Sequence, residues 1–262
     1  MTFLSCFNVD NVNGLTPISD ATRYLHLNQT SPVSGPLLGS ASQIIFSEDN
    51  QLLIVAVKGI NATTHTGYLA VWDVYENFTL SQDFNRVALP EGANYPYSLT
   101  IIPGQNALLA GDPAMGFDVF SNISGNSNSG NQRNIGVGSY AQSIPNQLTT
   151  CWSAYSPISQ NYYLSDLLEN RIAIISMDTN LKSTIIDVGR SALYHFIQPN
   201  LISQYISLGN DFGPLDVATV AAGGKGYVTV CVQNPDFRFT EYFSLAFFMC
   251  FLRLQKRWMP SR

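Results

Sequence analysis

Short apolar segments alternate with polar turns along most of the chain. Between residues 42 and 74, three apolar segments (44–46, 52–57 and 68–74) are separated by the polar turn 47–51 and by the loop 58–67, which contains Gly59 and Gly67. Segments rich in β-branched and aromatic residues and bounded by Gly, Asn, Asp and Ser are typical of antiparallel strands. One such meander cannot bury both of its faces, so the pattern predicts neighbouring sheets of the same kind.

The same pattern returns further along the chain. It is found at residues 97–120, at 150–177 and, in a weaker form, at 215–232. Aligning Leu52, Leu108 and Tyr162 gives spacings of 56 and 54 residues, and Tyr227 lies 65 residues further on. Repeats of three or four strands at this spacing are typical of β-propeller blades, whereas a β-sandwich is the alternative for many short strands. The regular spacing favours an all-β propeller, incomplete, with about four blades.

The pattern divides the chain into a partial propeller, residues 1–232, and an atypical tail, residues 233–262. Within the first part, strands are predicted at 2–9 and around 23–27, with a turn at Gly14, and segments 78–80 and 86–89 are predicted to form an outer strand. The start of the chain lacks the basic flank and the long apolar core of a signal peptide, so we expect it to begin inside a repeat. Residues 121–138 are polar and of low complexity, which predicts a loop between blades.

The tail differs in character from the repeats. It contains the apolar segment 245–252, followed by Arg253, Lys256, Arg257 and Trp258. The uncharged stretch is too short to span a bilayer, which needs about 20 residues. An interfacial helix is one interpretation of the apolar and basic residues. The interpretation favoured here is that the tail lies outside the propeller pattern.

The low charge content narrows the classes of function. Only 12% of the 262 residues are charged, the net charge is −5, and no basic stripe occurs before the last dozen residues. Binding of nucleic acid by phosphate neutralisation is therefore not expected. A surface covered mainly by Asn, Ser, Thr, Gln and Tyr is typical of extracellular β-proteins.

The cysteines and the N-glycosylation motifs bear on possible disulfides, metal sites and glycans. The four cysteines, Cys6, Cys151, Cys231 and Cys250, are widely scattered and show no zinc-ligand spacing. They could form one or two disulfides or remain buried thiols. N-glycosylation motifs occur at four sites: Asn28, Asn61, Asn77 and Asn122. The last three lie in predicted loops or turns.

Asp112 and Asp166 are the candidate catalytic or metal-binding residues. Each follows the second strand of its repeat, in Leu-Ala-Gly-Asp and Tyr-Leu-Ser-Asp. Equivalent positions in successive blades face the same end of a propeller, where two carboxylates could bind a divalent cation or act as a general acid and base. The alternative, favoured for turn aspartates, is that each accepts hydrogen bonds from backbone N–H groups. His65 is predicted to be an exposed loop residue and His195 a half-buried strand residue, so neither is assigned a role.

Six short motifs occur in a distinctive order: Ser-Pro-Val-Ser-Gly-Pro at 31–36, Ser-Gln-Ile-Ile-Phe-Ser-Glu-Asp at 42–49, Val-Lys-Gly at 57–59, Ala-Val-Trp-Asp-Val at 70–74, Cys-Trp-Ser at 151–153 and Tyr-Leu-Ser-Asp at 163–166. Together they resemble fungal extracellular propeller proteins of the 3-carboxymuconate cyclase-like group, within the lactonase-type seven-bladed propellers. The resemblance covers about residues 1–231. It implies a secreted, often glycosylated, surface protein. The chain departs from that pattern in its smaller number of blades and in its tail, so we expect a fragment or an open arc.

Two functions remain open on this basis. The preferred one is a surface- or wall-associated glycoprotein that binds a small molecule or a wall component, because ionisable residues are scarce. The alternative is an enzyme that forms or hydrolyses lactones, of the muconate cyclase or lactonase type, with a divalent cation as its conceivable cofactor. The catalytic His and Arg residues that the resemblance implies match no position of this chain. No partner nucleic acid and no transmembrane span are expected.

Overall fold

The computed structural model describes residues 3–27, 38–125, 135–190, 214–222 and 225–232, and these residues form sixteen strands. Three four-stranded antiparallel sheets, here called the first, second and third blades, lie between two hairpins. The first blade contains β3 (Ala41–Phe46), β4 (Leu52–Val57), β5 (Tyr68–Asp73) and β6 (Asn85–Ala88). The second contains β7 (Ser98–Ile102), β8 (Ala107–Asp112), β9 (Gly116–Phe120) and β10 (Tyr140–Ser143). The third contains β11 (Thr150–Ser156), β12 (Asn161–Asp166), β13 (Arg171–Met177) and β14 (Ser183–Arg190).

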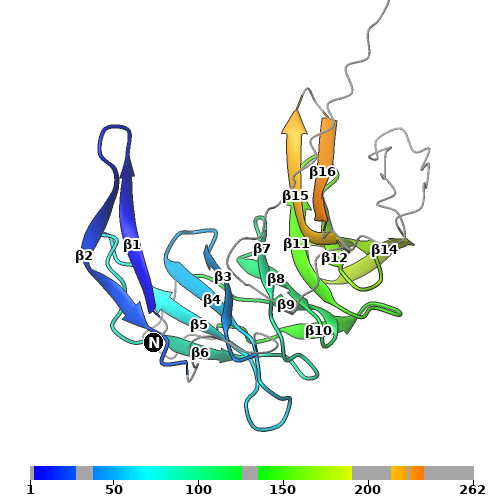
Figure 1. Cartoon of the computed structure of the whole chain (residues 1–262), viewed down its shortest axis with the longest axis horizontal. Coiled ribbons are helices and arrows are strands. Elements are labelled where there is room, and N and C mark those ends of the chain that lie inside the picture. The colour runs from blue at the N-terminus through cyan, green and yellow to red at the C-terminus, as the bar shows by residue number, and fades with distance from the viewer. Residues whose placement is uncertain (1–2, 28–37, 126–134, 191–213, 223–224, 233–262) are drawn as a thin grey trace, which may run out of the picture.

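The two hairpins lie at opposite ends of the arrangement. The N-terminal hairpin pairs β1 (Phe3–Asp10) with β2 (Gly14–Tyr24), and the C-terminal hairpin pairs β15 (Pro214–Ala222) with β16 (Lys225–Val232). Figure 1 shows the hairpins and blades following one another around an open arc. Within each blade the strands are hydrogen-bonded in chain order, and the first strands of successive blades are in contact: β3 with β7, β7 with β11, and β11 with β15. These are the relations of propeller blades around an axis.

The predicted all-β blade architecture is confirmed, and several boundaries are corrected. Strand 52–57 has the predicted bounds, and β9 and β13 end at the last residues of the repeats predicted at 97–120 and 150–177. Residues 78–80 do not form an outer strand, since Leu80 makes only an isolated bridge to Val74 and β6 alone fills that place. The strand predicted around 23–27 is the end of the longer β2, which reaches back to Gly14. The tail, residues 233–262, lies outside the described residues.

The hydrophobic core lies between blades and not within any one of them. In β4, Leu52, Ile54 and Ala56 face the second blade, and the residues between them face the N-terminal hairpin. A third cluster joins the second and third blades, and a fourth joins the third blade to the C-terminal hairpin. A strand packed on both faces carries a continuous apolar run, which explains why residues 52–57 show no polar alternation.

Side chains of the inner strands also tie each blade to the next. The Gln43 side chain accepts a hydrogen bond from the Leu99 backbone N–H (2.8 Å) and donates one to the Leu99 carbonyl (3.2 Å). Thr100 donates to the Ser153 carbonyl at 3.0 Å, and Thr219 donates to the Tyr155 carbonyl. The three links join successive inner strands, so they hold the blades in a common orientation around the arc.

Candidate functional site

Asp112 is the last residue of β8 and is fully buried. Its Oδ2 accepts hydrogen bonds from the backbone N–H groups of Asn94 (2.8 Å) and Tyr95 (3.0 Å), in the connection that leads into β7. Its Oδ1 accepts one from the N–H of Ala114 at 2.7 Å. Burial raises the pKa of Asp112, and these backbone donors oppose the rise. The carboxylate therefore links the connection that leads into β7 to the turn that follows β8, at one end of the second blade.

Asp166 holds the equivalent position in the third blade, as the last residue of β12. It accepts hydrogen bonds from the N–H groups of Leu148 (3.0 Å) and Thr149 (2.9 Å), which lead into β11. It also forms a buried ion pair with Arg171 at 3.3 Å. Both predicted aspartates thus occupy the same end of successive blades and bind backbone N–H groups, as the turn interpretation supposes. In the described part of the chain, no group of three or more His, Cys, Asp or Glu side chains could hold a metal ion, so the cation site stays a prediction.

A second buried carboxyl group, missed by the sequence analysis, faces Asp112. Asp118 in β9 is fully buried, and among the described residues no N–H or hydroxyl donor reaches either of its oxygens. Asp112 is the neighbouring ionisable group that acts on the Asp118 carboxyl group. Burial, followed by the negative charge of Asp112, raises the pKa of Asp118 well above its ordinary value. Asp118 is therefore harder to ionise than an ordinary aspartate.

Three residues from three successive blades form an array at the end of the blades where Asp112 and Asp166 lie. Lys58 directly follows β4, and its ammonium group lies 4.5 Å from the centroid of the Tyr97 ring, at the entry to β7. The Tyr97 ring makes an edge-on contact with Trp152 of β11, with 5.4 Å between the ring centroids. Tyr97 and Trp152 are half-buried, so both rings keep part of their surface in solvent. We call Lys58, Tyr97 and Trp152 the inner array.

Lys58 is unusual because it is a largely buried residue whose ammonium group has no counter-ion among the described residues. The residue is 7% exposed, and among the described residues no carboxylate pairs with it and no acceptor binds it. Its one described partner is the Tyr97 ring, a cation–π contact. Burial lowers the pKa of Lys58. A cation on a largely buried residue, with one aromatic ring as its described partner, is a favourable place for an anionic group.

Cys151 lies beside the inner array but is unsuited to nucleophilic chemistry. Burial, followed by the charge of Asp166, raises the pKa of the Cys151 thiol to about 12. The thiolate form is the nucleophile, so this thiol is inert at neutral pH. Cys6 and Cys151 are both free thiols. Cys250 lies outside the described residues.

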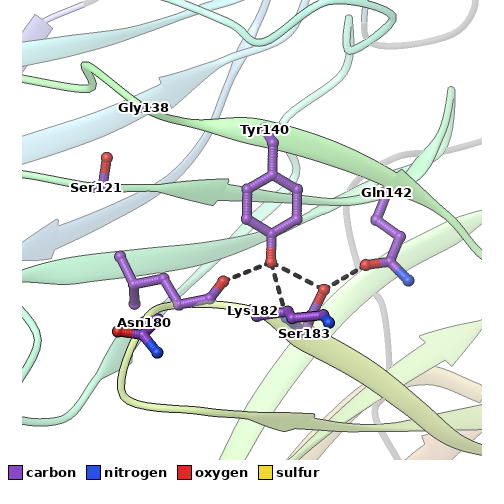
Figure 2. A pocket seen from close by; sticks show the side chains of 8 residues that line it. Ser121, Gly138, Tyr140, Gln142, Asn180, Lys182 and Ser183 are labelled. Atoms are coloured by element: carbon purple, nitrogen blue, oxygen red, sulfur yellow. Dashed lines mark hydrogen bonds between the residues drawn. The ribbon is translucent and has the colours of Figure 1, made fainter.

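A separate pocket of about 490 Å³ lies at the outer rim, between the second and third blades. Figure 2 shows Tyr140 of β10 pointing into it toward Ser183 at the start of β14. The Tyr140 hydroxyl lies 2.7 Å from the Leu181 carbonyl, 2.9 Å from the Ser183 hydroxyl and 3.1 Å from the Ser183 N–H. Ser183 in turn donates to Gln142. These polar groups of the pocket are hydrogen-bonded to one another, and the hydrogen bonds join the second blade to the third.

The predicted glycosylation sites fall on loops where they are described. Asn77 is exposed, and its side-chain oxygen accepts a hydrogen bond from the Thr79 hydroxyl at 2.7 Å. Asn122 is exposed, with its amide donating to the Val137 carbonyl at 2.9 Å, and Asn61 is half-buried in the turn after β4. Asn28 lies outside the described residues. Glycosylation of all four remains a prediction.

The remaining sequence motifs contribute no further site. His65 is exposed and lies 2.9 Å from the Thr64 hydroxyl, while His195 lies outside the described residues. Gly136 and Gly138 have positive φ angles of 79° and 86° in a turn before β10, which is the role of glycine in turns and not that of a nucleotide-binding loop. Among the described residues, no helix is long and apolar enough to cross a membrane.

Comparison with solved structures defines the class of fold. The periplasmic gluconolactonase PpgL of Pseudomonas aeruginosa superposes with a TM-score of 0.59 over 88% of this chain and 57% of its own length, at 14% identity. A candidate 6-phosphogluconolactonase from Bacteroides uniformis matches with a TM-score of 0.49, over 88% of this chain and 62% of its own, at 15% identity. No protein-family model and no curated protein matches the sequence. The fold is that of a lactonase-type β-propeller, and the chain spans a little over half the length of PpgL.

Proposed function

We propose that this chain belongs to a secreted, surface- or wall-associated propeller glycoprotein that binds a small polar molecule at the inner array. The observation that carries the proposal is the ammonium group of Lys58, a largely buried residue, which has an aromatic partner and no described counter-ion. Removing a charge from water costs several kcal/mol unless a partner compensates it. A bound anion would supply that partner.

The chemistry of the array defines the class of ligand. Lys58 suits a carboxylate, whereas the exposed parts of the Tyr97 and Trp152 rings suit the apolar face of a flat or cyclic molecule. Ligand sites in proteins commonly combine aromatic walls with a few polar anchors of this kind. Sugar acids combine a carboxylate with a compact polyhydroxyl skeleton. We therefore take an aldonic or uronic acid as the model ligand.

Binding is preferred over catalysis because the acidic groups near the array already have structural partners. Asp112 and Asp166 each accept three hydrogen bonds from backbone N–H groups. The Cys151 thiol is protonated at neutral pH. General acid–base catalysis needs a group that can reach the substrate and titrate near the working pH. Neither aspartate is free to do so without releasing its loop.

A lactone-handling enzyme is the second candidate, because the fold superposes on a gluconolactonase. The inner array would then hold the carboxylate or the ring oxygens of an aldonolactone. In this case the Asp112 and Asp166 positions would supply the acid, the base or the metal ligands. Similarity of fold alone does not assign this activity.

Calorimetric titration of the full chain with gluconate and glucuronate tests the proposal. We expect binding that weakens at least tenfold in Lys58→Met, which keeps the aliphatic stem and removes the charge. Lys182→Met is the matched control, since Lys182 is exposed and lies at the outer rim, and it should leave binding unchanged. Equal affinity in Lys58→Met and the parent chain would contradict the proposal.

The same preparations distinguish the two candidates. Hydrolysis of δ-gluconolactone above the buffer rate, abolished in Asp112→Asn or Asp166→Asn that still melt cooperatively, would establish the enzyme. Binding without turnover would support the binding protein. Expression in a secreting eukaryotic host, with a loss of mass after removal of N-glycans, checks the glycoprotein part of the proposal.

A further inference from the structure

A tight turn, residues 75–79, lies between β5 and β6 of the first blade. The Phe78 N–H donates to the Tyr75 carbonyl at 2.8 Å, and the Tyr75 N–H donates to the Thr79 carbonyl at 2.9 Å. Phe78 has a positive φ angle of 61°. A turn that is closed in this way and contains a left-handed residue is a common hairpin loop, and it fixes the directions of its side chains.

The side chains of Tyr75, Asn77 and Thr79 share one face of this turn. Tyr75 and Thr79 pair across the turn, so their side chains lie on the same side. The Asn77 side-chain oxygen accepts hydrogen bonds from the Thr79 hydroxyl at 2.7 Å and from the Thr79 N–H at 3.2 Å, which holds the amide on that side. Val74 and Leu80, the next pair, pack in the cluster that faces the N-terminal hairpin. Because successive pairs alternate in side-chain direction, the face of Tyr75 and Asn77 lies away from that cluster.

Both groups on this face are open to solvent. Asn77 is exposed, and Tyr75 is 52% exposed. Among the described residues, no acceptor binds Asn77 Nδ2, the atom to which an N-glycan is attached. The bonds from Thr79 hold Oδ1 and leave Nδ2 available. A sugar joined to Nδ2 therefore begins beside the Tyr75 ring.

The other described N-glycosylation motifs lack such a ring. Two residues before Asn122 stands Phe120, which is fully buried between the first and second blades. Two residues before Asn61 stands Gly59, and Asn61 itself is half-buried. Among the three motifs in the described part of the chain, the one at Asn77 alone has an exposed aromatic ring two residues before its asparagine.

We propose that Asn77 carries an N-glycan whose first sugar packs its apolar face on the Tyr75 ring. The proposal rests on the glycoprotein part of the proposed function. In the attachment step, the anomeric carbon of a lipid-pyrophosphate-linked oligosaccharide forms a bond to Nδ2. The bond from that carbon to the pyrophosphate oxygen breaks, the lipid pyrophosphate leaves, and Nδ2 loses one proton.

The contact between sugar and ring has a clear physical basis. The C–H groups of a hexosamine ring suit the negative face of an aromatic ring, and the contact removes apolar surface of both partners from water. The turn aligns Asn77 and Tyr75 only in the folded chain. The first sugar should therefore stabilise the folded state, and its effect should depend on Tyr75.

Melting of a single-sugar form tests this contact. The full chain is secreted by a eukaryotic host that adds high-mannose glycans and is trimmed by an endoglycosidase to one sugar at each occupied motif. The same chain from a bacterial host carries none, and mass spectrometry of the peptide that contains Asn77 gives the occupancy. We expect the single-sugar form to melt about 2–4 °C higher than the bare form. Tyr75→Thr keeps the motif and the sugar, yet it should abolish this difference, as should Asn77→Gln.

Ser124→Ala is the matched control, because it removes the motif at Asn122 and keeps the Asn122 side chain, so the difference should persist. A role of Tyr75 in the fold alone would shift both forms equally. Three outcomes would overturn the contact and leave the glycoprotein part of the proposed function standing: an unmodified Asn77 beside occupied motifs, equal melting temperatures of the two forms, or a difference that persists in Tyr75→Thr. Absence of glycan at all four motifs would overturn both.

Discussion

At the scale of single residues, the Asp112–Asp118 pair is the strongest electrostatic feature of the described chain. Both carboxyl groups are fully buried, and the negative charge of Asp112 adds to the effect of burial in raising the pKa of Asp118. Asp112 has backbone donors that stabilise its charge, whereas Asp118 has none among the described residues. The two environments therefore differ, and Asp118 is the carboxyl group that is harder to ionise.

The pair predicts that stability falls as pH rises. The folded chain holds the Asp118 proton above the ordinary pKa of 3.8, whereas the unfolded chain releases it near that value. The stabilisation is complete below this ordinary value and is lost as pH rises toward the folded-state pKa. While only the folded chain keeps the proton, the loss is about 1.4 kcal/mol per pH unit.

Asp118→Asn keeps a donor facing Asp112 and removes the titration. We expect its free energy of unfolding to depend less on pH above 4 than that of the parent chain. Urea unfolding at a series of pH values provides the measurement. Asp83→Asn, at an exposed loop position, should follow the parent profile. Identical pH slopes for Asp118→Asn and the parent chain would show that Asp118 is ionised.

At the scale of elements, the inner strands are held together by single side chains that bridge from blade to blade. Gln43 is the clearest example, because one amide group satisfies both backbone groups of Leu99 on the next inner strand. Leu99 is buried, so water cannot replace these bonds. A bridge of this kind sets the spacing of β3 and β7 without any backbone pairing between the two strands.

Gln43→Ala should therefore cost about 1–3 kcal/mol, because it leaves a buried backbone N–H group without its partner. The measurement is the free energy of unfolding from denaturant titration. Gln82→Ala, at an exposed position in the loop before β6, should stay within about 0.5 kcal/mol of the parent. A loss for Gln43→Ala no larger than for this control would mean that the bridge contributes nothing.

At the scale of the whole molecule, stability depends on neighbouring blades. Each blade contacts the unit before it and the unit after it, and the core consists of separate clusters between them. Repeat proteins with this organisation behave as sums of units and nearest-neighbour interfaces. A substitution that weakens one interface should therefore destabilise mainly the two units that form it under native conditions.

Hydrogen exchange can test this locality. Leu164→Ala, in the cluster between the second and third blades, should cost about 2–5 kcal/mol and speed amide exchange first in β12 and β13. Leu69→Ala, in the cluster between the first and second blades, is the reciprocal variant and should act first on β4 and β5. Uniform acceleration across all blades in both variants would show that the arc unfolds as one unit.

Local patterns were sufficient to predict most strands and the blade repeat. Residues 52–57, 116–120 and 171–177 are apolar, β-favouring and bounded by turns, and each segment meets its neighbours through short connections. The outer strands were less predictable. β10 and β14 are half-exposed, so their polar residues resemble those of loops. The length of β2 was missed because its first half contains Pro17 and polar residues.

The candidate site was predictable only in part. Asp112 and Asp166 could be chosen because each ends an apolar strand in a recurring position. Asp118 lies inside a strand, and nothing local distinguishes it from an exposed strand residue. The inner array unites residues 58, 97 and 152, which no sequence spacing relates. Such groups meet only when three blades have been placed side by side.

By itself, the sequence determined the strands, the turns and their repetition, because these depend on hydrophobic period and turn chemistry within a few residues. The tertiary structure alone decided which polar groups are buried together, and which cation lacks a counter-ion among the described residues. These properties arise from packing between blades about 55 residues apart in the chain, and a local pattern carries no information on contacts at that distance.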